Sequence, residues 1–281
     1  MHALFPEAPQ AWEDLVRPLC AAIRLPHLTQ HLHVLLLSAV FYQSIYHVSA
    51  YVSPRISASY RKLNRKTKVN WDIHTVSMVQ WCKSLIILYL IHDVWQNDLD
   101  TRKDKIHGFS NYAGDVYATA CGYFLWDAII STYFIKWFGV GFAFHGFASL
   151  QIFLFSYAPF LQYWGPAFLL FEASTPFLNI HWYLDKVNMT GSIYQIVNGV
   201  LLLLTFFLVR ICWGWFMAFD VFSNIWYNLD RVNWIISSIY LFSNMSLNFL
   251  NIYWFGKMIQ ALGKRMQSPS KESPVEAKKS R

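Results

Sequence analysis

The sequence predicts an all-α, polytopic membrane protein: a helical bundle of about seven transmembrane helices. Of the 281 residues, 55% are hydrophobic and 14% are charged, whereas an ordinary soluble domain has about 25% charged residues. Aromatic residues make up 19% of the chain, and such side chains are enriched where membrane helices meet the lipid headgroups. Seven stretches are apolar over the roughly 20 residues that a helix needs to cross the bilayer.

The predicted spans follow one another along most of the chain. In order, they cover residues 32–53, 70–92, 112–136, 139–157, 163–186, 193–217 and 232–256. The fifth contains Gly165, Pro166 and Pro176 and follows Pro159, and proline breaks or kinks a helix because it lacks the amide donor. The fifth span is therefore expected to be irregular.

The two ends of the chain are expected to lie outside the spans. Residues 1–31 are predicted to be a lumenal or interfacial segment, in which Trp12, Leu15, Leu19 and Ile23 recur at helical spacing and predict a short interfacial helix. This segment lacks the basic start and apolar core of a signal peptide, so no cleavage is expected. Residues 265–281 predict a disordered basic tail, rich in Ser, Pro, Lys and Glu.

The distribution of Lys and Arg predicts the orientation, because positive residues concentrate in cytosolic loops. The loop between the first two spans carries Arg55, Arg61, Lys62, Arg65, Lys66 and Lys68. Placing it in the cytosol puts Lys136, Lys186 and the C-terminus on the same side, and the N-terminus in the lumen. The basic residues cluster beside apolar segments, which fits cytosolic loops better than a nucleic-acid groove.

The last residues of the chain predict its location. Lys278 and Lys279 stand four and three places from the end, and lysines at these positions of a cytosolic tail resemble the dilysine signal read by the retrograde coat of the early secretory pathway. Such a signal is an address read by a receptor. We therefore expect a multi-pass protein of the endoplasmic reticulum membrane, with the retrieval coat as a partner.

Polar and ionisable residues within the spans are the candidates for a functional site, because each charge in hydrocarbon costs about 2.5–3.5 kcal/mol or more. They are Ser77, Gln80, Lys83, Asp115, Asp127, His145, Glu172, Asn179 and His181. Pairing makes such charges tolerable. We therefore expect Lys83 to pair with Glu172 or Asp127.

Other polar residues receive a structural interpretation. Asn244, Asn248 and Asn251 share one face of the seventh span and are predicted to hydrogen-bond across helices. The cysteines lie far apart without CxxC spacing, so neither a disulfide nor a metal site is expected. Three histidines near the ends of the first span are interpreted as interfacial: His31, His33 and His47.

Four stretches carry a family resemblance: Lys68–Gln80, Gly122–Asp127, Phe144–Ser149 and Leu170–Trp182. In order and spacing they are similar to the TLC-domain family of membrane proteins, which includes the ceramide synthases, and the resemblance covers residues 66–264. The pattern formed by Glu172, Ser174, Pro176, Phe177 and Asn179 most resembles the branch of TLC domain-containing protein 4.

The resemblance implies a six-span bundle around a lipid-accessible cavity, preceded by one additional N-terminal span, and it implies work on lipids. In ceramide synthases a pair of adjacent histidines serves acyl transfer. Here the matching positions hold Phe144 and His145, and Gln80 stands where many family members have a histidine. The sequence thus departs from a true ceramide synthase at the residues that would carry the reaction.

Two functional hypotheses follow for a protein of lipid homeostasis. In the first, the protein transfers an acyl group from acyl-coenzyme A to a membrane lipid, with His145 as base or acyl acceptor and Asp127 or Glu172 as its orienting carboxylate. The residues assigned to lipid or substrate binding are Ser77, Gln80, Lys83, Asn179 and His181. The alternative is a non-catalytic protein that binds lipid or escorts cargo. The expected partners also include further copies of this chain, in a homo-oligomer.

Overall fold

The computed structural model describes residues 4–82, 89, 95 and 99–267, and every regular element in these ranges is a helix, which confirms the all-α fold class. The first half of the chain contains α1 (Gln10–Ala22), α2 (Leu28–Ile56), α3 (Ala58–Lys62), α4 (Arg65–Cys82), α6 (Leu99–Lys103), α7 (Asn111–Tyr133), α8 (Ile135–Phe138) and α9 (Val140–Leu154). The second half contains η1 (Phe155–Tyr157), η2 (Gln162–Trp164), α10 (Gly165–Leu169), η3 (Leu170–Ser174), α11 (Thr175–Lys186), α12 (Ile193–Phe206), η4 (Phe207–Cys212), α13 (Trp213–Trp226) and α14 (Trp234–Gln267).

Each predicted span falls on helical structure, with α4 covering the first part of 70–92 and the remainder lying largely outside the described residues. Within the described residues, four helical segments are suited by length and composition to cross a membrane: Leu28–Ile56, Val140–Tyr157, Ile193–Trp226 and Trp234–Gly263. The chain is therefore a multi-pass membrane protein, whereas the count of seven spans stays a prediction.

The fifth predicted span is broken, as its prolines predict. It consists of η2, α10, η3 and α11 in succession, and Pro166 and Pro176 each lie in the first turn of a new α-helix. Because Pro176 has no amide hydrogen, the α-helical bond to the carbonyl of Glu172 cannot form. The chain tightens at this point into the 3-10 turn of η3.

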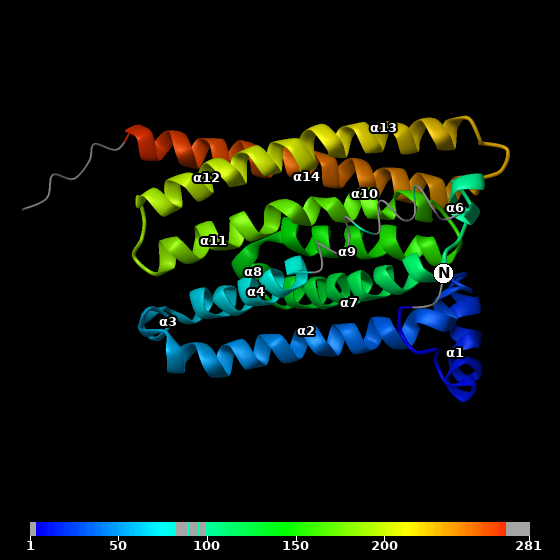
Figure 1. Cartoon of the computed structure of the whole chain (residues 1–281), viewed down its shortest axis with the longest axis horizontal. Coiled ribbons are helices and arrows are strands. Elements are labelled where there is room, and N and C mark those ends of the chain that lie inside the picture. Colours follow the sequence, from blue (N-terminus) through cyan, green and yellow to red (C-terminus); the bar gives the residue numbers. More distant parts are fainter. Residues whose placement is uncertain (1–3, 83–88, 90–94, 96–98, 268–281) are drawn as a thin grey trace, which may run out of the picture.

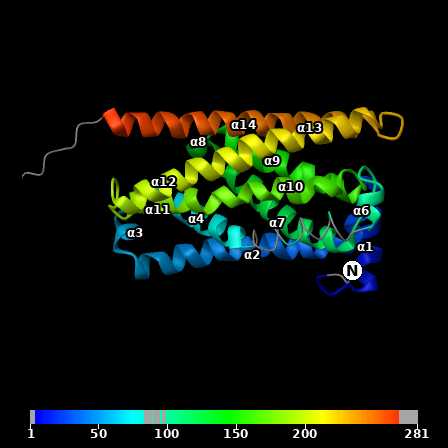
Figure 2. The same cartoon turned by 45° about the horizontal axis from the view of Figure 1, so that its top comes forward.

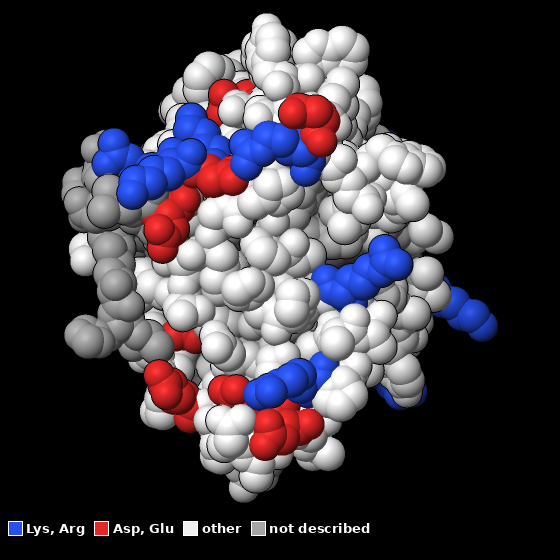
Figure 3. All heavy atoms as spheres, turned by 90° about the vertical axis from the view of Figure 1, so that its right-hand side faces the viewer, with Lys and Arg blue, Asp and Glu red and all other residues white. Residues whose placement is uncertain are grey.

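The helices form a bundle with two distinct ends (Figures 1 and 2). One end carries α3, the turn from α11 to α12 and the end of α14, while the other carries the N-terminus, α1, α6 and the turn from α13 to α14. The loop after α2, the turn after α11 and the end of α14, all predicted to be cytosolic, thus share one end, while α8 with Lys136 lies further in. Figure 3 looks onto the opposite, predicted lumenal end, where acidic and basic side chains are interspersed around an uncharged centre.

Helix α1 matches the short helix predicted from the spacing of its apolar residues. It lies across the end of the bundle (Figure 1), and Leu15 and Leu19 point away from the protein, with 72% and 58% of their surface exposed. An exposed apolar stripe beside a membrane protein is suited to the headgroup boundary.

Close packing around α7 holds the bundle together. Helix α7 packs against both α2 and α9. A Cβ atom on Gly122 of α7 would lie 2.5 Å from the Cβ of Ser38 on α2, and one on Gly146 of α9 would lie 2.8 Å from the Cα of Ala128 on α7. Small residues let helix backbones approach in this way, and such packing is a main source of helix association in lipid.

A buried pair ties α2, α7 and the N-terminal segment together, and it shows that the interfacial interpretation of His31 is wrong. His31 is 3% exposed, and its Nδ1 lies 2.8 Å from Oδ1 of Asp115 on α7. The other oxygen of Asp115, Oδ2, accepts a hydrogen bond of 2.7 Å from the amide of Leu4. One carboxylate therefore joins three segments that are distant in the sequence.

We expect Asp115→Ala to destabilise the protein, because it removes this carboxylate and leaves His31 buried without its partner. Breaking a buried pair costs roughly 3–5 kcal/mol, which for a chain of this size corresponds to a melting temperature lower by about 6 °C or more. Thermal unfolding in detergent micelles measures the change. Asp14→Ala is the control, since Asp14 is exposed and pairs only with neighbours on α1. Equal effects of the two variants would contradict a tying role for Asp115.

Candidate functional site

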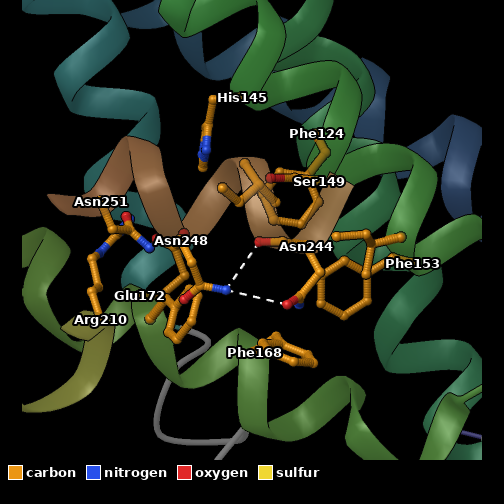
Figure 4. Close-up of a pocket in the computed structure, with 13 residues that line it drawn as sticks. Phe124, His145, Ser149, Phe153, Phe168, Glu172, Arg210, Asn244, Asn248 and Asn251 are labelled. Carbon is orange, nitrogen blue, oxygen red and sulfur yellow. Dashed lines mark hydrogen bonds between the residues drawn. The ribbon is translucent and has the colours of Figure 1, made fainter. Parts of the chain in front are cut away.

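A small cavity lies inside the bundle, between α7, α9, η3, η4 and α14 (Figure 4). Its volume is about 40 Å³, which suffices for water but not for a lipid headgroup. Its walls combine aromatic rings with polar groups, namely His145, Ser149, Glu172, Arg210, Asn244, Asn248 and Asn251. A small cavity with aromatic and polar walls at this position is the candidate functional site.

His145 reaches this cavity from α9. Figure 4 shows its ring extending toward the side chains of α14 and η3. The ring lies edge-to-face against Trp254, with 5.4 Å between ring centroids, and its Nδ1 is buried without a hydrogen-bond partner among the described residues. Aromatic packing thus positions an imidazole whose Nδ1 is not engaged.

The carboxylates assigned to orient His145 have other partners. Oδ1 of Asp127 accepts a hydrogen bond of 3.3 Å from Ser131, and Oε2 of Glu172 accepts one of 2.9 Å from Thr175. Of the two, Glu172 shares the cavity with His145, and Asp127 is absent from its lining. Within the described residues, no hydrogen bond joins His145 to either carboxylate. The structure thus brings His145 and Glu172 to one site without pairing them.

Arg210 is the residue of this site that the sequence analysis missed. It lies in η4, a π-helical turn between α12 and α13, and is 8% exposed. Such turns interrupt α-helices frequently at functional sites. A signal was available, since Arg210 is the single charged residue between 193 and 217, and an ionisable residue in a span is a functional candidate by default.

Neutral side chains hold the Arg210 guanidinium. Its Nε donates to Ser174 at 3.0 Å, and its two terminal nitrogens donate to Asn251 at 3.3 Å and to Thr175 at 3.4 Å. Because the Thr175 hydroxyl in turn donates to Glu172, it links the cation to the carboxylate. Among the ion pairs of the described residues, none joins Arg210 to Glu172 directly.

The asparagines of α14 make different contacts from one another. Asn251 hydrogen-bonds across helices to Arg210, as predicted. Asn248 donates to the backbone and side-chain oxygens of Asn244, one turn earlier on the same helix, and the Oδ1 of Asn248 is buried without a partner in the described structure. Asn248 thus adds an unused acceptor to the cavity wall rather than an interhelical bond.

A second polar cluster joins α4 to α11. The Nδ2 of Asn179 donates to Oγ of Ser77 at 3.2 Å, and Oδ1 of Asn179 lies 2.7 Å from Nδ1 of His74. The His74 ring stacks on Trp182 with 4.3 Å between centroids. Ser77 and Asn179, two of the predicted lipid-binding residues, thus lie together, and His74 joins them. His74 stands three residues before Ser77, on the same helix face and within Lys68–Gln80, and this spacing was the available signal.

The other residues predicted to bind lipid are dispersed. Gln80 accepts a hydrogen bond from the hydroxyl of Tyr42 at the contact between α2 and α4. His181 lies beside Gly199, where α11 meets α12. Lys83 lies outside the described residues, and so does its expected pairing with Glu172 or Asp127.

Comparison with known proteins identifies the fold family of these helices. The model of the TLC domain matches residues 70–260. An uncharacterized TLC domain-containing protein of Schizosaccharomyces pombe is 44% identical over 98% of this chain and 93% of its own length. Topoisomerase I damage affected protein 4 of Saccharomyces cerevisiae is 32% identical over 88% of this chain and 89% of its own.

The resemblance to the branch of TLC domain-containing protein 4 is also confirmed. The human protein of that name is 28% identical over 76% of this chain and 81% of its own length. No solved structure matches the chain.

We expect Thr175→Val to lower stability by roughly 1–3 kcal/mol, because valine keeps the shape of threonine but removes the hydroxyl that contacts both Glu172 and Arg210. Thermal unfolding in micelles measures the loss, and Thr175→Ser should restore most of it. Thr205→Val is the matched control, since the Thr205 hydroxyl donates only to carbonyls of its own helix. If Thr175→Val and Thr205→Val lower the melting temperature equally, the link between the Arg210 cation and the Glu172 carboxylate contributes nothing to stability.

Proposed function

Because the chain belongs to the TLC-domain family, we propose that it is an endoplasmic reticulum membrane protein of lipid homeostasis, which binds the polar group of a membrane lipid between His145, Glu172 and Arg210. The observation that carries the proposal is the buried guanidinium of Arg210 beside an imidazole whose Nδ1 has no hydrogen-bond partner in the described chain.

The electrostatics of the cavity favour a polar or anionic ligand. A buried charge is costly unless it is paired, and the groups that accept hydrogen bonds from Arg210 are neutral. Glu172 is connected to Arg210 only through the hydroxyl of Thr175. A phosphate or carboxylate oxygen from a lipid would accept the remaining N–H groups of the guanidinium, in the geometry that arginine offers to such anions.

A surface groove along α9 and α14 supports access from the bilayer. A groove of about 310 Å³ lies on the outer side of these two helices, lined by Phe144, Phe147 and Phe242 among others. One side-chain hydrogen bond of the described residues crosses between them, from Ser243 to Gln151 at 3.1 Å. Because a lipid headgroup needs more room than 40 Å³, binding requires these helices to part, which also breaks the aromatic contacts of His145 and Phe142 with Trp254.

Acyl transfer is the second candidate, and the unengaged Nδ1 of His145 favours it. In this reaction the imidazole takes the proton of a lipid hydroxyl or amine while that group attacks the thioester carbonyl of acyl-coenzyme A, and coenzyme A leaves as its thiol. The missing contact between His145 and a carboxylate argues for binding over this reaction, since a catalytic imidazole is usually oriented by a third group.

We expect a lipid class that shifts in cells lacking the protein to be restored by wild type, in part by His145→Ala, which removes one of the three binding groups, and not by Arg210→Gln, which removes the cation. A quantitative lipidome of the complemented cells measures this, with protein levels matched by immunoblot. Arg210→Lys keeps the charge and should restore in part, and His47→Ala controls for loss of an exposed histidine. Restoration by Arg210→Gln overturns the binding proposal. Failure of His145→Ala alone, together with product formation by purified protein, establishes acyl transfer instead.

The proposed address rests on Lys278 and Lys279, which lie outside the described residues. The double variant Lys278→Ser, Lys279→Ser is expected to move the protein from the endoplasmic reticulum toward later secretory compartments, because the retrieval coat reads both lysines. Microscopy against compartment markers tests this, with Lys271→Ser in the same tail as the control. Unchanged retention of the double variant would place the address elsewhere in the chain.

A further inference from the structure

A groove runs along the second half of α2, away from the cavity described above. It has a volume of about 710 Å³, within the range of ligand pockets, and lies between α2, α4 and α11. Its lining extends from Phe41 to Ser57, with Trp71 and Tyr183 on the other side. The stretch from Phe41 to Ile56 measures about 22 Å along a helix, which is deeper than one leaflet of a hydrocarbon core of roughly 30 Å.

The wall that α2 contributes is apolar and unoccupied by other side chains. Val48 is 59% exposed and Ile56 is 78% exposed, and both line the groove with Phe41 and Val52. Apolar walls of this length suit an acyl chain, which makes no hydrogen bonds.

The polar groups beneath the groove are already satisfied by one another. Ser49 donates to Asp72 at 2.7 Å, Tyr60 donates to the other oxygen of Asp72 at 3.0 Å, and the hydroxyls of Thr75 and Tyr183 lie 2.8 Å apart. Because these groups bond within the protein, they require nothing from an occupant.

A cluster of positive charge stands at one end of the groove. The groove ends at Ile56 and Ser57, and residues 54–68 that begin there contain six basic residues and no acidic one. None of the ion pairs among the described residues involves any of the six. Lys62 and Lys66 are exposed. An anionic headgroup at this end would therefore meet unpaired cations.

We propose that this groove binds one acyl chain of an anionic phospholipid, whose headgroup contacts the basic residues between Arg55 and Lys68. The apolar length of the groove selects a lipid chain, and the charge at its end selects an anionic headgroup over a zwitterionic one. This site lies between α2 and the rest of the bundle. It does not depend on the function proposed for the cavity of His145, Glu172 and Arg210.

The test uses full-length protein in phosphatidylcholine liposomes that contain phosphatidylserine with a photoreactive acyl chain. After illumination, mass spectrometry maps the labelled residues. We expect saturable labelling concentrated on 41–57, with Trp71 and Tyr183, and at least about fivefold weaker labelling there by the matching photoreactive phosphatidylcholine.

Matched variants separate the groove from lipid that merely surrounds the protein. Val48→Trp fills the groove and should reduce its labelling severalfold, whereas Val200→Trp, at a residue of α12 that is 52% exposed, should not. The pair Lys62→Gln and Lys66→Gln should lower the preference for phosphatidylserine at least about fivefold. Lys103→Gln, which changes an exposed lysine of α6 at the other end of the bundle, should leave it unchanged.

Three results would overturn the proposal. The first is labelling that is spread over all exposed apolar faces and is the same in the Val48→Trp and Val200→Trp variants. The second is equal labelling by the two phospholipids, which would show that the groove has no preference for an anionic headgroup. The third is crosslinking of α2 to a second copy of the chain in place of lipid. The lysine variants keep the test decisive if Val48→Trp fails to fold, because both lysines are exposed and unpaired.

Discussion

The absence of water in the bilayer core is the constraint that the rest of this structure obeys. A polar group inside the bundle must find its partner within the protein, since none is available from lipid. The described helices meet this demand by placing polar side chains where helices touch: Gln80 against Tyr42, Asn179 against Ser77, and Asp115 against His31. These contacts lie beside close backbone approaches, such as that of Gly122 to α2. Packing and hydrogen bonding therefore support the same interfaces.

The candidate cavity is an exception to this pairing of polar groups. Around it, Arg210 is satisfied by neutral groups alone, and nitrogen or oxygen atoms of His145 and Asn248 remain without partners in the described chain. The backbone is also irregular on two sides, at the 3-10 turn η3 and the π turn η4. Irregular backbone is tolerated at membrane depth where it is buried or lines a cavity. The cavity thus combines irregular backbone with polar atoms that have no partner in the described chain, and further such atoms occur elsewhere, at Trp12, His31, His33 and Ser237.

The sequence predicts the fold better than it predicts the site, for a physical reason. Spans follow from local apolar composition and breaks follow from Pro166 and Pro176, so both can be read along the chain. Which residues meet depends on helix rotation and on interhelical contacts, which single-sequence patterns do not encode. His31 is a clear case: its place near the end of a span suggests an interface, yet its partner Asp115 is 84 residues away. Arg210 is a different case, because its lone charge in an apolar run was a readable signal.

The position of α2 bears on how this family is divided into domains. The family match begins at residue 70, after α2 has ended, yet α2 supplies the partner of Gln80, the histidine for Asp115 and the acceptor for the indole of Trp126, which is Gln43. The unit that the family model recognises is therefore smaller than the unit whose helices pack together. In evolutionary terms, α2 is under the same packing constraints as the rest of the bundle, so substitutions on its inner face would have to be matched by changes on α4 and α7.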